Sequence, residues 1–213
     1  AAGSFEKAIR LSEQAAGSSK KEEAEKNGDH FRCDPGKENM AMVLRKEIPL
    51  HIHAHRSDDI CTAIRIAKEY DIRIVIVHCT DGIDIAEHIA ASGFPAIVGP
   101  SMNPCSKQEV WNKSFETAGI LNRAGVKVCI TADHDVTPLY YLPIYAAMAV
   151  RFGMDDAEAL RAVTSYPAEI LGIDDRKGAL VSGKDADLVI WSHHPFDIHA
   201  KAEHVFIEGK QEC

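Results

Sequence analysis

Three histidines alternate with apolar residues in one short stretch, PLHIHAH. They are His51, His53 and His55. Residues two apart in a β-strand share a face, so we expect these imidazoles to point the same way. Neutral imidazole is a common ligand of zinc and similar divalent ions. A single interior histidine is more often a hydrogen-bonded core residue, so the stretch poses a metal site as a hypothesis that needs further ligands.

Further candidate ligands follow two later apolar stretches. His78 ends DIRIVIVH, and Asp133 lies in VKVCITADHD, where it could also act only as a helix cap. Parallel β/α barrels keep their active sites at the carboxyl ends of their strands. Imidazole and carboxylate together suit zinc and related ions. A metal there would acidify a bound water, and Asp133 could accept its proton.

The elements that would position these groups alternate along the chain. Strands and helices joined by short links indicate an α/β fold with a parallel sheet and crossover helices. The stretches IVIV and VCIT are continuously apolar, as expected for strands covered on both faces. Strands are predicted within 49–55, 71–78, 94–100 and 126–135, and helices from Ser57 and within 83–93, 106–125, 140–151 and 155–172.

The two ends of the chain differ from this central region. DADLVIWSHH and EHVFIEGKQE read as antiparallel strands of a small β-region. Near the start, SFEKAIRLSEQAA predicts a helix, a polar connection follows, and ENMAMVLRKE predicts a short second helix. We therefore divide the chain into residues 1–47, 48–175 and 176–213.

Composition excludes several classes of protein. The 213 residues are 46% hydrophobic and carry a formal net charge of −8, which argues against nucleic acid as a partner. No apolar run approaches the roughly 20 residues needed to cross a bilayer, and no signal peptide is expected. The six cysteines show no C-x-x-C spacing, which favours free thiols and a cytoplasmic location.

The number of β/α units between the histidine triplet and Asp133 is limited. One unit takes roughly 25–30 residues, because a complete eight-unit barrel has about 250. Only three further strands therefore fit between His51 and Asp133. The triplet is expected on a late strand, and the early strands are expected to be missing from this chain.

Several stretches resemble the C-terminal half of the amidohydrolase superfamily, in its imidazolonepropionase-related branch. They include IPLHIHAHRSDDI, VHCTDG, VGPSMNPCSKQE, AGVKVCITADHDV and PAEILGI followed by KGALVSGKDADLVIW, from about Ile48 to Gly209. The resemblance implies strands five to eight of a TIM-type (β/α)₈ barrel, followed by part of a small β-sandwich domain. It also implies hydrolysis of amide-type or cyclic C–N bonds with one or two divalent metals, most simply zinc, with iron or manganese as alternatives.

The resemblance also assigns roles to individual residues. His53 matches the metal ligand of strand five, and His78 matches the histidine of strand six. Asp133 matches the carboxylate of strand eight, which contacts metal and carries the proton of the attacking water. These three residues are the predicted metal ligands, and Asp133 is the predicted catalytic residue.

Residues near the predicted ligand on strand five have other expected roles. His55 and Arg56 lie just beyond His53 at the mouth of the barrel and are predicted to contact substrate. Arg56 could hold a substrate carboxylate, or it could pair with a neighbouring aspartate, Asp58 or Asp59. His51 lies deeper along the strand and is expected in the core.

The chain lacks other parts of the family pattern. The H-x-H of strand one and the ligand of strand four have no counterpart here. The first hypothesis is therefore the C-terminal part of a hydrolase of small molecules, weakly active or inactive alone, completed by an N-terminal half. The second is an inactive half-barrel that self-associates through its open sheet. The third is a metal-binding protein without turnover.

Overall fold

The computed structural model of the chain describes residues 35–212. The helix predicted in SFEKAIRLSEQAA and the polar connection after it lie outside the described residues. Contacts divide the described chain into two compact units, residues 35–50 with 65–74 and residues 51–64 with 75–212. The predicted divisions at residues 47 and 175 stay predictions.

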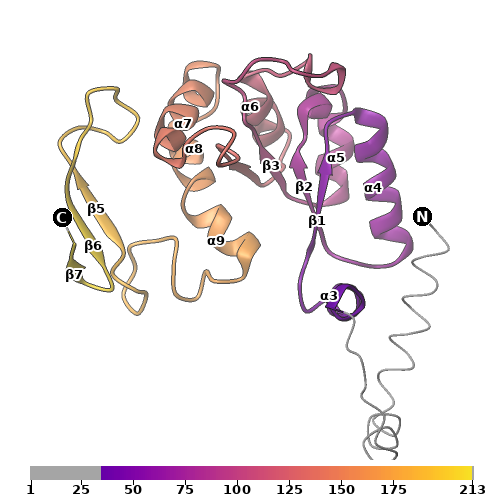
Figure 1. Ribbon diagram of the computed structural model, residues 1–213, viewed down its shortest axis with the longest axis horizontal. Coiled ribbons are helices and arrows are strands. Elements are labelled where there is room, and N and C mark those ends of the chain that lie inside the picture. The colour runs from indigo at the N-terminus through magenta and orange to yellow at the C-terminus, as the bar shows by residue number, and fades with distance from the viewer. Residues whose placement is uncertain (1–34, 213) are drawn as a thin grey trace, which may run out of the picture. The chain divides into compact units, whose positions relative to one another are not determined.

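A parallel four-stranded sheet forms the centre of the fold (Figure 1). Its strands follow one another in space in chain order, β1-β2-β3-β4. Ile76 lies opposite Ala96, and Ala96 lies opposite Val128, in parallel register. The predicted α/β fold with a parallel sheet is confirmed. The strands are β1 (Leu50–Ala54), β2 (Ile74–His78), β3 (Ala96–Val98) and β4 (Val128–Ile130).

Helices connect the strands, as parallel neighbours require. The predicted helix within 83–93 begins as a 3-10 turn, and Gly93 ends it in a left-handed conformation with φ 74°. The helical segments are α3 (Pro35–Leu44), α4 (Ser57–Glu69), η1 (Thr80–Ile85), α5 (Ala86–Ser92), η2 (Gln108–Val110), α6 (Glu116–Arg123), η3 (Leu139–Tyr141), α7 (Leu142–Arg151), α8 (Asp156–Ala162) and α9 (Ser165–Leu171).

The two faces of the parallel sheet are buried to different extents. Ile76, Ala96 and Val128 point to one face and have no exposed surface. On the other face, Val77 and Ile97 are only half-buried, although Cys129 beside Ile97 is buried. The sequence predicted cover on both faces, and the structure gives complete cover only on the first.

Asp155 and Glu158 make different contacts at the start of α8. The Asp155 carboxylate accepts a hydrogen bond from the Glu158 backbone N–H at 3.1 Å and so caps α8. The Glu158 carboxylate does not complete a capping box but accepts hydrogen bonds from Asn122 at 3.0 Å and Tyr166 at 2.8 Å. It thereby links α8 to α6 and α9.

A second, antiparallel sheet follows the helices. It consists of β5 (Leu188–Trp191), β6 (Ala202–Ile207) and β7 (Lys210–Gln211), in the order β5-β6-β7. The predicted antiparallel pairing is confirmed, with Val189 opposite Val205. Before β5, Asp185 pairs with Arg176 at 2.7 Å and with Lys177 at 2.9 Å.

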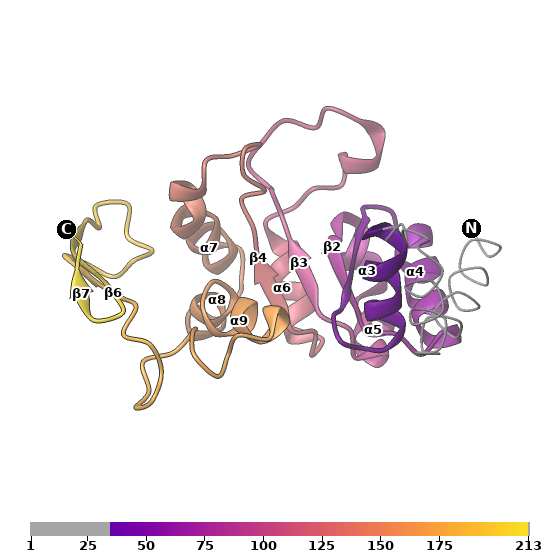
Figure 2. The same cartoon turned by 60° about the horizontal axis from the view of Figure 1, so that its bottom comes forward.

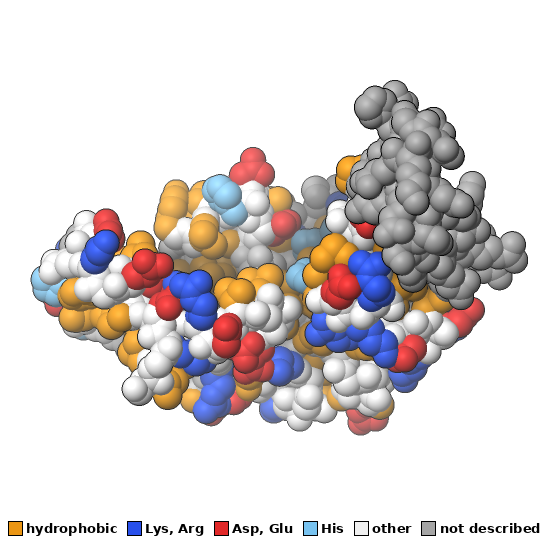
Figure 3. All heavy atoms as spheres, turned by 90° about the horizontal axis from the view of Figure 1, so that it is seen from below, with side chains coloured by type: hydrophobic (Ala, Val, Ile, Leu, Met, Phe, Trp, Pro, Cys, Tyr) orange, Lys and Arg blue, Asp and Glu red, His pale blue; other side chains and the backbone are white. Residues whose placement is uncertain are grey.

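The surface carries both signs of charge. Acidic and basic side chains are interspersed on the face drawn in Figure 3, with apolar side chains between them. Among residues 35–212, no helix is both long and apolar enough to cross a membrane. The described cysteines, Cys61, Cys79, Cys105 and Cys129, are free thiols. The cytoplasmic location stays a prediction.

The buried face of the sheet predicts a large difference between two isoleucines. Ile76 is 0% exposed in β2, whereas Ile198 is 83% exposed in a loop. Ile76→Ala should lower the free energy of unfolding by about 2–5 kcal/mol, because it leaves a cavity in the core. Ile198→Ala should change it by less than about 0.5 kcal/mol. Equal effects in urea denaturation would contradict this packing.

Candidate metal centre

Three imidazoles meet at the carboxyl ends of β1 and β2, one of them from the residue just after β1. We call His53, His55 and His78 the imidazole cluster. Its ring centroids lie 4.3–4.8 Å apart, and its ligand nitrogens all lie within 4.8 Å of one another. Two nitrogens on one zinc ion lie at most about 4.2 Å apart, because each Zn–N bond is about 2.1 Å. Small side-chain movements would therefore bring the cluster around one ion.

An unusual backbone turn places His78 in the cluster. His78 and Cys79 both have positive φ, 71° and 52°. L-residues avoid this region, and each such residue costs roughly 1–3 kcal/mol. The Cys79 N–H donates to the Ala54 carbonyl at 3.0 Å, which holds the turn against β1. Burial raises the pKa of the Cys79 thiol to about 12, so this sulfur is protonated and is a poor metal ligand.

A single hydrogen bond fixes the tautomer of His78. Its Nδ1 lies 2.6 Å from the Gly99 carbonyl oxygen, which can only accept, so Nδ1 carries the hydrogen. The Nε2 atom of the neutral ring then has a free lone pair, as a metal ligand needs. Gly99 has φ 123°, and a Cβ there would lie 2.3 Å from the Thr131 carbonyl oxygen. Only glycine fits this position.

His55 is held more deeply than the sequence predicted. Its Nδ1 lies 2.8 Å from the Thr80 hydroxyl, and the residue is only 8% exposed. β1 ends at Ala54, so the strand alternation that relates His51 to His53 does not extend to His55. His55 therefore offers a third imidazole to the cluster. Its predicted role as a substrate contact stays a prediction.

Burial lowers the pKa values of two rings of the cluster. Desolvation, followed by repulsion from the neighbouring imidazoles His78 and His53, lowers the pKa of His55 to about 4. Desolvation also lowers the pKa of His78, although its hydrogen bond to Gly99 acts in the opposite direction. Both rings are therefore neutral at pH 7, which is the form that binds metal.

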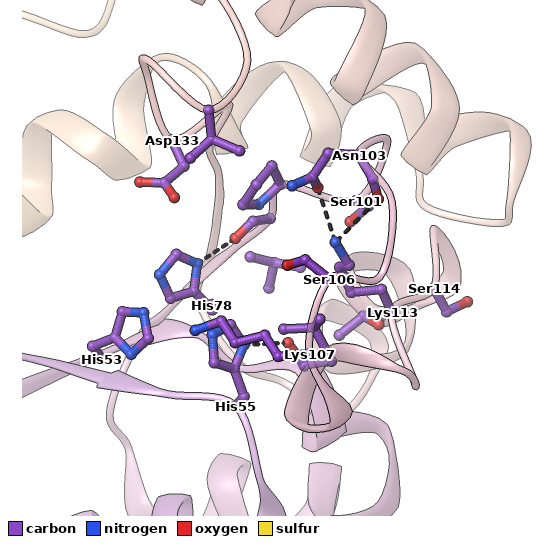
Figure 4. A pocket seen from close by; sticks show the side chains of 17 residues that line it. His53, His55, His78, Ser101, Asn103, Ser106, Lys107, Lys113, Ser114 and Asp133 are labelled. Atoms are coloured by element: carbon purple, nitrogen blue, oxygen red, sulfur yellow. Dashed lines mark hydrogen bonds between the residues drawn. The ribbon is translucent and has the colours of Figure 1, made fainter.

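Asp133 lines the same cavity as the imidazole cluster (Figure 4). Its φ of 51° is left-handed, and its N–H donates to the Thr131 hydroxyl at 3.0 Å. Its negative charge acts to raise the pKa of His78. The structure therefore brings His53, His78 and Asp133 to one cavity, with Asp133 outside the close group of nitrogens. Their roles as metal ligands stay predictions.

A long connection forms the other wall of the cavity. Residues 99–115, here the β3–α6 connection, extend beyond the strand ends (Figure 2). Lys113 Nζ fastens this connection by donating to the Asn103 carbonyl at 3.1 Å and to the Asn103 side-chain oxygen at 2.9 Å. The cavity volume is about 220 Å³. Ser101, Asn103, Ser106, Lys107 and Lys113 line it, and sequence reasoning assigned none of them.

Two predicted residues lie elsewhere. Arg56 makes two hydrogen bonds to Asp58, Nε to Oδ1 at 2.9 Å and Nη2 to Oδ2 at 3.0 Å, and does not line the cavity. The alternative prediction, pairing with a neighbouring aspartate, describes this geometry. His51 was expected in the core but is exposed in β1.

The lowered pKa of His55 predicts how the stability of the metal-free protein depends on pH. The unfolded chain binds a proton near pH 6.5, whereas folded His55 resists protonation until about pH 4. Stability should therefore fall as pH drops below 6.5, by up to about 2 kcal/mol at pH 5. Urea denaturation at pH 7.5 and pH 5 measures this loss. His55→Gln should reduce the loss, and an unchanged pH dependence would contradict the argument.

Known proteins resemble this chain in fold and in sequence. A model of the amidohydrolase family matches residues 37–211. Imidazolonepropionase of Brucella suis biovar 1 is 31% identical over 166 residues, which are 76% of this chain and 38% of that protein. A zinc-bound adenosine deaminase structure from Xanthomonas campestris has a TM-score of 0.60 at 24% identity, covering 85% of this chain and 49% of that one. This last likeness concerns the fold alone.

A solved amidohydrolase of Thermotoga maritima MSB8 is more similar. It has a TM-score of 0.86 and 40% identity, and the match covers 100% of this chain and 55% of that protein. The chain thus spans about half the length of this structure, and a smaller share of the curated relatives. The family match covers most of the chain. The chain belongs to the amidohydrolase family, with imidazolonepropionases among its relatives, as the sequence resemblance predicted.

Proposed function

We propose that the chain is the C-terminal part of a metal-dependent hydrolase of amide-type or cyclic C–N bonds in small molecules. The observation that carries this proposal is the meeting of the imidazole cluster and Asp133 in one cavity at the strand ends. Family membership supports the hydrolytic chemistry. The three histidines, whose ligand atoms lie within 4.8 Å of one another, support a divalent metal.

The residues fit a metal of this kind. Neutral imidazoles are ligands for zinc, iron and manganese, and His78 already donates its other ring nitrogen to a carbonyl, as metal-bound histidines do. His53 and His78 would hold the ion, with His55 as a third imidazole. When bound, the metal would polarise the substrate carbonyl and acidify the attacking water.

Asp133 is the group of this chain that would move protons. Its carboxylate lines the cavity together with His78, and Asp133 is the acidic residue among the lining residues. It would take the proton of the attacking water as the C–O bond forms. The same proton would pass to the leaving nitrogen as the C–N bond breaks, so that Asp133 is regenerated.

We further propose that the parallel sheet is strands five to eight of a (β/α)₈ barrel, and that the antiparallel sheet is part of a β-sandwich. The half-buried Val77 and Ile97 support the proposal that this face of the sheet is a barrel interior, which further polypeptide would cover. β1 and β4 are both edges of the sheet among the described residues. A complementary N-terminal half would pair with these edges and supply the remaining ligands.

The same open face favours a second candidate function. An inactive module that associates with a second copy would also cover Val77 and Ile97 and pair its sheet edges. The two proposals differ in what completes the sheet. The third candidate is a protein that binds metal without turnover. An enzyme should lose activity in the Asp133→Asn variant, whereas a protein that only binds metal has no activity to lose.

Zinc binding to the full chain tests the centre itself. Equilibrium dialysis followed by elemental analysis should find zinc bound to the unmodified chain. His53→Ala and His78→Ala should each weaken zinc binding at least tenfold, because each removes a ligand. His88→Ala is the matched control, since His88 is exposed on α5 outside the cluster. Equal zinc content in all the variants would refute the centre.

Activity should require the complementary half. Co-expressed with it, the chain should release amine from a panel of N-acyl amino acids and cyclic amides, whereas the chain alone should be weakly active or inactive. Asp133→Asn should lower kcat of the assembled enzyme by roughly 10²–10⁴-fold, because proton transfer is lost. Full turnover by the isolated chain would contradict the proposal that it is incomplete.

A further inference from the structure

The cavity is richer in positive than in negative side chains. Lys107 and Lys113 line it, and Asp133 is the acidic residue among the lining residues. Lys113 is engaged, because its ammonium donates to Asn103 and to the Pro104 carbonyl at 3.3 Å. Neutral imidazoles and a bound divalent ion would make the cavity more positive still. Its electrostatics therefore favour an anionic ligand.

Lys107 is the cation of the cavity that an anion could reach. Its ammonium pairs with Glu109 at 2.6 Å, and the two side chains are 56% and 37% exposed. An exposed pair of this kind contributes little to stability, so a ligand carboxylate could replace Glu109 at small cost. Lys107 lines the same cavity as the imidazole cluster (Figure 4).

Two serine residues of the β3–α6 connection line the same cavity as Lys107. Ser101 and Ser106 line the same cavity, and Figure 4 shows Ser106 and Lys107 on the wall opposite Asp133. Within residues 35–212, neither of these serine hydroxyls makes a hydrogen bond to another protein group. They can donate to a ligand carboxylate, and such charge-assisted bonds are stronger than neutral ones.

We propose that Lys107 anchors a free carboxylate of the substrate, so that the hydrolase acts on small amides that carry an acidic group. This inference rests on the proposed function and names the substrate class of the same cavity. The role predicted for Arg56 thereby moves to Lys107, because Arg56 is paired with Asp58 and lies outside the cavity lining. A cavity of about 220 Å³ suits a compact substrate, since pockets for drug-sized ligands are roughly 300–1,000 Å³.

Two substitutions that break the same ion pair should have opposite effects. The probes are N-acetyl-L-alanine and its uncharged amide, titrated by calorimetry into the full chain with and without zinc. The unmodified chain should bind the acid at least tenfold more tightly than the amide. Lys107→Met should reduce this ratio to about threefold or less, whereas Glu109→Gln should increase affinity for the acid severalfold, because a competing anion is removed.

Lys127→Met is the matched control. Lys127 is also a partly exposed lysine in an ion pair, with Glu169, and it does not line the cavity. It should leave the ratio unchanged. Equal binding of acid and amide, binding of neither, or the same effect from Lys107→Met and Glu109→Gln would overturn the inference. Zinc content measured on the same samples reports separately on the metal centre, and titration of the zinc-free chain tests Lys107 whether or not zinc binds.

Discussion

The hydrogen bond from His78 to the Gly99 carbonyl connects the ends of two neighbouring strands and determines which nitrogen of His78 faces the cavity. It requires left-handed backbone at both residues, with φ 71° at His78 and 123° at Gly99. Packing in the core offsets the energetic cost of this conformation. Ile76 and Ala96 are fully buried, and their pairing fixes the register of β2 against β3 just before the turn. Core packing and site chemistry are therefore coupled at one point. A shift of β3 against β2 would break the hydrogen bond between His78 and Gly99, and the tautomer of His78 would no longer be fixed.

Sequence patterns predicted the strands and helices well because periodicity and caps are local signals. They also predicted that His78 ends a strand, because a continuous apolar run precedes it, whereas Asp133 lies beyond β4, which ends at Ile130. The inward turn at His78 could not be predicted, since it depends on a hydrogen bond to Gly99, 21 residues away. His55 was assigned to substrate because it lies just beyond the predicted ligand His53, and that role stays a prediction. Lys107 was missed because the β3–α6 connection has no periodicity to read.

One face of the parallel sheet is incompletely covered, and the chain matches only part of the length of its relatives. The chain covers 55% of the amidohydrolase of Thermotoga maritima, and one face of its sheet leaves Val77 and Ile97 half-buried. A parallel sheet is normally covered on both faces, so this face is the natural place for further polypeptide. The cavity is open in the same way. Its described walls come from the ends of four strands and from the β3–α6 connection, and His53, which lines it, is exposed.

The central claim is that the imidazoles of β1 and β2 bind one divalent ion. X-ray absorption at the zinc edge tests it most directly on the zinc-loaded full chain. The account predicts two or three imidazole nitrogens at about 2.0–2.1 Å from zinc, with one fewer in His78→Ala. A spectrum showing only oxygen neighbours, or one unchanged by His78→Ala, would contradict it.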